Sequence, residues 1–476
     1  MISRSKKTMD LTTGPLFSKI LQFIFPLILT NLLHQFYNAA DIMIVGLSTD
    51  PNAVGAVGSS ASYLALITNV FIGFSVGAEV VVARYIGASD KENASRATHT
   101  AICMSLLFGV LGSLIGIAFA RPMMILMGYT DRLLTLGLRY TYIYLACIPF
   151  MSLTNFLCAI LRANGNTKTS LYVLSGTGIL NILLNLFFVL VVGLSVEGVA
   201  IATAIANLVS AIILWRYLTV QKTDSKLSFK KLRITKFQFG EIARVGFPAG
   251  IQNALFSVSN IIIQSSILQV NQAITPPGSA YAPVIKGNAA TASIEAFIFT
   301  ALSAVSSTAS AFTGQNVGKK NYQRVRAVLW QLCLISSAIA ILMSAAAIIF
   351  HRPLLTLYGV TEGSDILSKI TYETAWKKVI WKWPTFLIYA IMNTCAGVLR
   401  GLGKSTTSAM ISFVGTCVFR VLWIYTVFRA LGTLEIIYVS YPISWLLTGI
   451  FFMITVLYFL RRLSAHTKTE ATQIEN

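Results

Sequence analysis

The segment PLFSKILQFIFPLILTNLLHQFYNAADIMIVG, residues 15–46, decides how this chain folds. It is mostly apolar and longer than the ~20 residues that a transmembrane helix needs. Asn31, His34, Asn38 and Asp41 are spaced by three, four and three residues, so they share one helical face. A carboxylate inside a spanning helix costs at least ~2.5–3.5 kcal/mol, so it should face a bundle interior or a wet cavity. The segment therefore predicts a transmembrane helix that carries an ion or proton site.

The composition of the whole chain is that of a multi-pass helical membrane protein. Its 476 residues are 55% hydrophobic and only 11% charged, whereas a soluble domain would carry about 25% charged residues. No signal-peptide core and cleavage site follow the basic residues 1–10, so we expect the first helix to be retained. The six cysteines stand singly in apolar segments, which indicates packing roles. We expect no cofactor and no metal beyond Na⁺.

The net charge of +20 is a topology signal. With the N-terminus inside, most of the 37 Lys and Arg residues fall in the inner segments, above all between residues 216 and 244. This distribution follows the positive-inside rule, so both termini are predicted to be cytoplasmic and the charge needs no nucleic-acid partner. The twelve predicted spans lie at about residues 18–46, 54–82, 97–120, 135–160, 168–192, 197–218, 240–268, 288–313, 326–350, 373–399, 405–430 and 434–460.

The chain contains an internal repeat. Residues 25–31 (FPLILTN) recur as residues 247–253 (FPAGIQN), and residues 161–166 (LRANGN) are echoed by residues 399–404 (LRGLGK). Each half holds six spans, an even number, so the halves are parallel repeats with a cavity expected between them. We predict an N-terminal lobe at residues 11–220, a cytoplasmic linker at 221–236 and a C-terminal lobe at 237–463.

One asymmetry between the halves concerns the acid of the first helix. Ile263 stands in the second half at the place of Asp41. Because the acid is present only once, we place cation coupling in the N-terminal lobe.

Four segments resemble the multidrug and toxic compound extrusion (MATE) family of bacterial exporters: residues 11–46, 73–88 (GFSVGAEVVVARYIGA), 161–170 (LRANGNTKTS) and 399–408 (LRGLGKSTTS). The resemblance runs from about residue 11 to 460. It implies an all-α membrane protein with 12 transmembrane helices in two six-helix lobes around a central cavity. It also implies a bacterial inner-membrane exporter that exchanges drugs for inward Na⁺ or H⁺. The family's cation-site motif falls here on Asp41, Asn181, Asn185 and Thr203.

These four side chains would offer a carboxylate, two amide carbonyls and a hydroxyl, which suit a hard cation. Interhelical hydrogen bonding is the alternative reading of the two Asn residues, which lie four apart on one helical face. Many family members have Asp at the position of Asn185, so its absence leaves Na⁺ and H⁺ both open.

Other residues near this site have alternative readings. His34 and Tyr37 could relay a proton toward Asp41, or His34 could be a hydrogen-bonded bundle histidine. Pro26 and Pro248 each interrupt the backbone hydrogen bonding of a lobe's first helix, which predicts either a static kink or a bending point.

The predicted substrate cavity combines polar residues of both halves: Asn31, Asn38, Asn253, Asn260, Glu295 and Arg420. Glu295 would bind a cationic substrate or be a hydrated helix-end acid, and Arg420 would pair with an acid or with helix carbonyls. The lysines at 377, 378 and 382 alternate with Trp residues, which is typical of an interface belt, with a basic cavity mouth as the alternative. Glu79, Glu197, Glu373 and Glu435 lie near span ends, where we expect them to be solvated.

We predict a secondary-active exporter that moves amphipathic organic cations by alternating access in exchange for Na⁺ or H⁺. The rival is a flippase of lipid-linked oligosaccharides or lipids in the same superfamily, which would favour a basic cavity. An enzyme is not expected, because the four histidines form no metal cluster and the GLGKS run has Val398 where a phosphate loop needs Gly. We expect a monomer that contacts membrane lipids and no nucleic acid.

Overall fold

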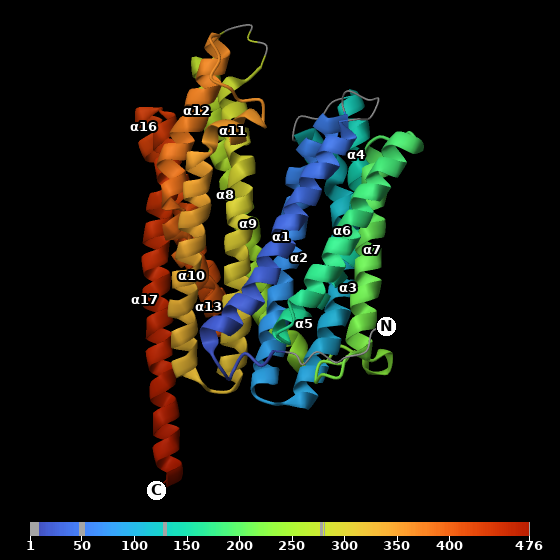
Figure 1. Cartoon of the computed structure of the whole chain (residues 1–476), viewed down its shortest axis with the longest axis vertical. Coiled ribbons are helices and arrows are strands. Elements are labelled where there is room, and N and C mark those ends of the chain that lie inside the picture. The colour runs from blue at the N-terminus through green and yellow to red at the C-terminus, as the bar shows by residue number, and fades with distance from the viewer. Residues whose placement is uncertain (1–8, 47–52, 127–130, 277–278, 280, 476) are drawn as a thin grey trace. The chain divides into compact units, whose positions relative to one another are not determined.

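The computed structural model describes residues 9–46, 53–126, 131–276, 279 and 281–475, and every regular element in these ranges is helical (Figure 1). The α-helices are α1 (Leu16–Val45), α2 (Ala53–Gly87), α3 (Lys91–Leu126), α4 (Asp131–Ala146), α5 (Ile148–Ala163), α6 (Lys168–Leu186), α7 (Val196–Val220), α8 (Lys236–Ile274), α9 (Pro283–Gly318), α10 (Tyr322–Ile349), α11 (His351–Thr356), α12 (Ile366–Lys382), α13 (Phe386–Gly401), α14 (Ser405–Ser412), α15 (Phe419–Trp423), α16 (Arg429–Leu431) and α17 (Leu434–Glu475). Short 3-10 turns lie at η2 (Phe229–Lys231) and η3 (Trp383–Thr385), and π-helical segments at η1 (Phe187–Val191), η4 (Phe413–Val418) and η5 (Ile424–Phe428).

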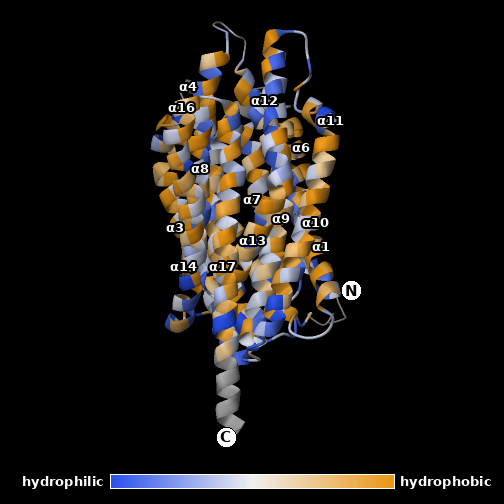
Figure 2. Ribbon diagram, turned by 90° about the vertical axis from the view of Figure 1, so that its left-hand side faces the viewer, coloured by the Kyte–Doolittle hydropathy of each residue, from blue (hydrophilic) through white to orange (hydrophobic). Residues whose placement is uncertain are grey.

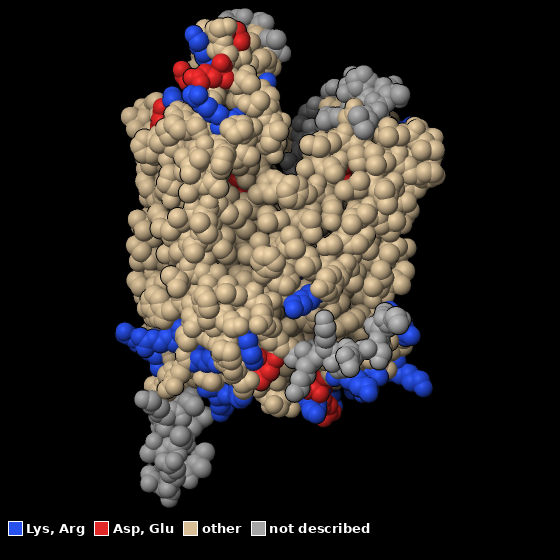
Figure 3. All heavy atoms as spheres, viewed as in Figure 1, with Lys and Arg blue, Asp and Glu red and all other residues tan. Residues whose placement is uncertain are grey.

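The predicted all-α membrane fold is confirmed. Within the described ranges, 10 helices are long and apolar enough to cross a membrane, or 11 if the bent pair at 133–163 counts as one span. Apolar residues run along these helices in Figure 2, and on the face drawn in Figure 3 most of the visible Lys and Arg side chains gather toward its lower edge. The tenth predicted span, 373–399, falls on α12, η3 and α13, where lysines and the turn at Trp383–Thr385 interrupt the apolar helix.

The chain divides into two compact units. Unit 1 contains residues 1–254, 310–324 and 400–406, and unit 2 contains residues 255–309, 325–399 and 407–476. In unit 1, α2, α3 and α5 pack on one another and α6 packs on α1 and α7, around a core that includes Phe156 and Ile102. In unit 2, α12 packs on α17, and Ile263 and Tyr438 belong to the same buried cluster. The predicted lobe boundaries at 220 and 237 stay a prediction.

Gly87 allows two helices of unit 1 to approach one another closely. A Cβ atom on Gly87, at the end of α2, would lie 1.8 Å from the backbone oxygen of Gln315 in α9. A side chain at residue 87 would therefore force the two helices apart, which explains why this position needs Gly.

A buried ion pair corrects one expectation from the sequence. Glu79 of α2 is fully buried instead of solvated, and it accepts a hydrogen bond from Nε of Arg162 at 2.7 Å. The charge of Arg400 also acts on Glu79. Arg162 and Arg400 come from the two copies of the repeated motif, so one acid of unit 1 compensates basic residues from both.

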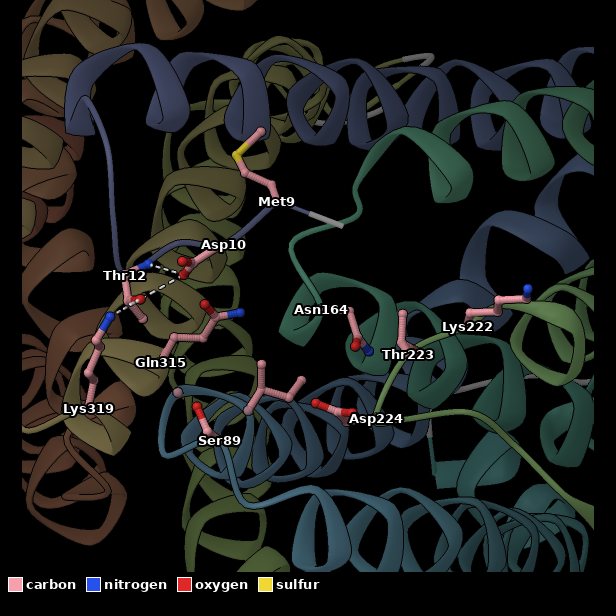
Figure 4. A pocket seen from close by; sticks show the side chains of 12 residues that line it. Met9, Asp10, Thr12, Ser89, Asn164, Lys222, Thr223, Asp224, Gln315 and Lys319 are labelled. Atoms are coloured by element: carbon pink, nitrogen blue, oxygen red, sulfur yellow. Dashed lines mark hydrogen bonds between the residues drawn. The ribbon is translucent and has the colours of Figure 1, made fainter. Parts of the chain in front are cut away.

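The segment before α1 forms a strap across unit 1. Leu11 is fully buried; its backbone N–H donates to Oε1 of Gln315 at 3.0 Å, and Nδ2 of Asn316 donates to its carbonyl at 3.2 Å. Arg324 donates to the carbonyl of Thr13 at 2.8 Å. Beside the strap lies a polar pocket of about 310 Å³, which Met9, Asp10, Asn164, Thr223 and Lys319 line among others (Figure 4).

The carboxylate of Asp10 stabilises the turn at residues 10–13 of the strap, where it accepts hydrogen bonds from Thr12 and Thr13. Burial acts to raise the pKa of Asp10, but hydrogen bonds from Thr12 and Thr13 and the charge of Lys19 outweigh it and lower the pKa to about 2. The ionised carboxylate is therefore the form that the folded strap favours.

Asp10→Asn should lower the melting temperature of the detergent-solubilised protein at neutral pH, and the difference from wild type should shrink as the pH falls. The folded-state pKa lies below the ordinary value of 3.8, so the stabilisation is complete above 3.8 and is lost as the pH falls toward about 2. Thermal unfolding followed by tryptophan fluorescence at several pH values measures this difference. Glu362→Gln is the control because its ion pair with Arg352 is exposed; a pH-independent effect of Asp10→Asn would contradict the assignment.

Candidate functional site

Asp41 lies in the last third of α1 and is partly exposed. Its Oδ1 accepts a hydrogen bond from Nδ2 of Asn185 on α6 at 2.5 Å. A neutral amide satisfies one lone pair of the carboxylate but does not cancel its charge. The carboxylate of Asp41 is therefore held in place and keeps its capacity to bind a cation.

The polar chain continues from Asn185 across two helices. Nδ2 of Asn185 also lies 3.4 Å from Oδ1 of Asn181, and Nδ2 of Asn181 donates to Oγ1 of Thr203 on α7 at 3.3 Å. Asn181 and Asn185 are one helical turn apart and buried. The structure thus brings together the four residues that the sequence motif predicts as a cation site.

One oxygen in this cluster is left over. Oδ1 of Asn185 is buried and has no hydrogen-bond partner among the described residues. An unsatisfied buried carbonyl costs ~1–3 kcal/mol unless it finds a ligand. Together with the side-chain oxygens of Asp41, Asn181 and Thr203, it belongs to a set of oxygens of the type that a small hard cation prefers. The π-helical segment η1 begins two residues later, and such segments are frequent at functional sites.

Two tyrosines near the acid were missed by sequence reasoning. The charge of Asp41 acts on the phenol groups of Tyr140 and Tyr144, which lie one turn apart on α4. Nothing in their local sequence distinguishes them from packing tyrosines, because only the fold brings α4 toward α1.

The predicted relay residues lie on the same helix with other partners. Nδ1 of His34 lies 3.5 Å from Nδ2 of Asn38, and both side chains are exposed. The hydroxyl of Tyr37 donates to the carbonyl of Ser175 at 3.2 Å, and its ring covers Gly178 of α6. Tyr37 therefore fixes the contact of α1 with α6, and a relay role stays a prediction.

The predicted substrate-cavity residues of unit 1 and α8 lie in several environments. Asn31 is half-buried on α1, and Nδ2 of Asn253 donates to the backbone oxygen of Asn69 at 3.2 Å. Asn260 is exposed on the part of α8 that belongs to unit 2. Both helices continue through their prolines, Pro26 and Pro248, so bending at these positions stays a prediction.

Unit 2 contains a buried charged cluster, and two lysines there correct the interface-belt prediction. Nζ of Lys382 lies 2.7 Å and Nζ of Lys378 3.4 Å from Oε2 of Glu295, and all three side chains are at most 5% exposed. Oε1 of Glu295 accepts from the indole of Trp383 at 3.1 Å. Only Lys377 of the lysine trio is partly exposed, in an ion pair with Glu435.

Arg420 is buried on α15, between the π-helical segments η4 and η5. Its Nε donates to Oγ of Ser444 on α17 at 3.0 Å, and its guanidinium lies over the ring of Tyr441 at 4.1 Å. Among the described residues, the hydroxyl of Ser444 is its hydrogen-bond partner, where the sequence predicts an acid or helix carbonyls.

Gly178→Ala should destabilise the protein by about 1–3 kcal/mol, because the new Cβ would lie 1.9 Å from the ring of Tyr37 and overpack the contact between α1 and α6. Gly176→Ala on the same helix is the matched control: it meets nothing within 4 Å and should be neutral or stabilising. Unfolding in detergent measures both. A Tyr37→Ala/Gly178→Ala pair should cost less than the sum of the single changes; additivity would contradict the contact.

Comparison with known proteins identifies the fold and the family. The MatE family model matches residues 26–187 and again residues 248–426. The probable multidrug resistance protein YoeA of Bacillus subtilis is 25% identical over 89% of each chain, and the multidrug export protein MepA of Staphylococcus aureus is 23% identical over 52% of this chain and 55% of its own. A multidrug resistance MATE family transporter of the MOP superfamily superposes with a TM-score of 0.86 at 19% identity, covering 97% of this chain and 100% of the other. The chain belongs to the MATE family of multi-pass membrane transporters.

Proposed function

We propose that this protein is a secondary-active multidrug exporter, in which inward movement of Na⁺ or H⁺ through the Asp41 site drives outward movement of amphipathic compounds. The hydrogen-bonded cluster of Asp41, Asn185, Asn181 and Thr203, with its unpartnered buried oxygen, is the observation that carries the proposal. The relatives YoeA, a probable multidrug resistance protein, and MepA, a multidrug export protein, support the drug-export part.

In this proposal, the driving cation and the cationic substrate compete for the carboxylate of Asp41, which is partly exposed. A cation bound at Asp41 neutralises the acid and takes up the oxygen of Asn185, whereas the empty site leaves a negative charge in an apolar bundle. The two states therefore favour different arrangements of α1 against α6. One charge crossing a potential of 100 mV supplies about 2.3 kcal/mol, so an ion gradient is sufficient to concentrate a drug outside.

The proposed substrates are amphipathic organic cations. Asp41 supplies the negative charge for them, together with the exposed polar face of α1 that carries His34 and Asn38. Glu295 is less suited to this role, because its two oxygens are already bonded to Lys382 and Trp383.

The proposed location is the bacterial inner membrane, with both termini in the cytoplasm. Basic residues of unit 1 gather beside the N-terminal strap, among them Lys222, Lys319 and Arg324. Such a basic end is expected on the cytoplasmic side of the membrane.

Asp41→Asn should abolish ion-driven dye efflux while leaving membrane abundance unchanged, because the amide keeps the shape of the side chain but not its charge. Efflux from proteoliposomes with separately imposed Na⁺ and pH gradients measures the effect and identifies the ion. Glu197→Gln is the matched control: it removes an acid of the same unit that pairs with the exposed Arg139. Equal coupled efflux by wild type and Asp41→Asn would remove Asp41 from the mechanism.

Asn185→Leu should raise the ion concentration for half-maximal efflux by about tenfold or more, because it removes both the hydrogen bond to Asp41 and the unpartnered oxygen. Asn155→Leu is the control, since the amide of Asn155 bonds to the backbone of its own helix at Met151. Titration of the driving ion in proteoliposomes gives the result. An unchanged ion dependence in Asn185→Leu would show that α6 supplies no ligand.

A further inference from the structure

Unit 2 holds more buried positive charge than its acids balance. Lys378, Lys382 and Arg420 are each at most 4% exposed, and Glu295 is the one carboxylate that the described residues pair with this group. The charge of Lys382 acts on Lys378, and that of Arg420 on Lys382. The three cations therefore belong to one electrostatic cluster with an excess of positive charge.

The guanidinium of Arg420 has a hydrogen-bond donor that is not used within the described residues. Its Nη2 is buried and has no hydrogen-bond partner within the described part of the chain, while Nε is bonded to Ser444. An arginine presents its donors as a planar fork, which matches the two oxygens of a carboxylate, sulfonate or phosphate. The unpartnered Nη2 is therefore a donor that an anionic ligand can use.

Aromatic rings surround the cluster. The ring centroid of Tyr441 lies 3.9 Å from Nζ of Lys382 and 4.1 Å from Cζ of Arg420, and Trp445 lies 5.9 Å from each. Ring faces attract cations but carry no net charge, so they leave the excess in place. Tyr441 and Phe299 are only half-buried, which gives the cations an aromatic border that an apolar ligand body can contact.

The internal repeat shows which residues of the first half correspond to the lysines of this cluster. When residues 161–166 are matched to residues 399–404, Tyr140 and Tyr144 of the first half correspond to Lys378 and Lys382 of the second. The break between α4 and α5 matches the break between α12 and α13 in the same register. The acid of the first half, Asp41, is Ile263 in the second. Equivalent places thus hold an acid with tyrosines in one half and lysines with isoleucine in the other.

We propose that Lys378, Lys382 and Arg420 form an anion-binding subsite in unit 2, which takes the carboxylate, sulfonate or phosphate of an amphipathic ligand. Uncompensated charge in an apolar interior is costly, and a bound anion removes that cost. Glu295 occupies part of the positive field in the described state and competes with the ligand anion for Lys382. The subsite deepens the proposed export function: it favours substrates that carry an anionic group besides their cationic one.

A pair of dyes tests the subsite directly. Rhodamine B has a free carboxylate and its ethyl ester does not, so their affinities for the purified protein compare the same ring system with and without the anion. Wild type should bind rhodamine B about tenfold more tightly than the ester, and Arg420→Gln should remove most of this preference. Fluorescence anisotropy of each dye measures binding without any ion gradient.

Matched variants show whether the dye preference depends on the charge of the subsite or on the net charge of the protein. Arg429→Gln on α16 removes an exposed arginine nine residues after Arg420 and should leave the preference unchanged. Lys382→Gln/Glu295→Gln removes a buried pair together and keeps the net charge, so it should fold even where Lys382→Gln does not. Retention of the full preference in folded Arg420→Gln, or tighter binding of the ester by wild type, would overturn the proposal.

Vesicle composition identifies the source of the anion. In phosphatidylcholine vesicles containing phosphatidylglycerol, a lipid phosphate that occupies the subsite should weaken rhodamine B binding to wild type but not to Arg420→Gln. Equal binding of rhodamine B to wild type in vesicles with and without phosphatidylglycerol assigns the subsite to soluble amphiphiles. In both cases wild type must still bind rhodamine B more tightly than its ester. Asp41→Asn should retain that preference, so loss of ion coupling and loss of anion binding are separate outcomes.

Discussion

The hydrogen bond from Asn185 to the carboxylate of Asp41 joins α1 to α6 in a region where the surrounding helices are apolar. An acid inside the membrane-spanning bundle has little water to solvate its charge, so it depends on the partner that the fold supplies. Asp41 receives a neutral amide, Glu79 receives a guanidinium, and Glu295 receives two ammonium groups. A neutral partner leaves a charge that a transported cation can neutralise, whereas a charged partner fixes the acid as a structural element. The type of partner, more than the depth of burial, therefore separates the proposed coupling site from the ion pairs that stabilise the bundle.

The two halves of the chain use one architecture with opposite polarity. Both contain a first helix that includes a proline and a broken fourth helix, and both are matched by the same family model. Tyr144 and Lys382 occupy equivalent places in the register of the repeated motif, but one lies near an acid and the other belongs to a basic group. Duplication thus preserved the backbone arrangement, while substitution of a few buried side chains gave each half a different electrostatic character.

The sequence predicted the helical membrane fold and the composition of the Asp41 cluster, because hydropathy, helical spacing and the family motif can each be recognised in short stretches of sequence. It did not predict that Glu79, Lys378 and Lys382 are buried, because near span ends a charged residue can face water or another helix, and only the packing decides. The same limit applies to Tyr140 and Tyr144, whose proximity to Asp41 depends on the path of α4. The 10 or 11 apolar helices of the described residues are roughly consistent with the predicted 12. The tenth predicted span, 373–399, is less apolar because of its lysines, although the segment still forms two helices.

The shared acid Glu79 links the two motif copies. Arg162 bonds to it directly, and Arg400 of the second copy adds its field. Removal of Glu79 would take the ion-pair partner from Arg162 and a negative charge from the surroundings of Arg400. The last turns of α5 and α13, which carry the two motif copies, therefore depend on one acid that belongs to neither copy.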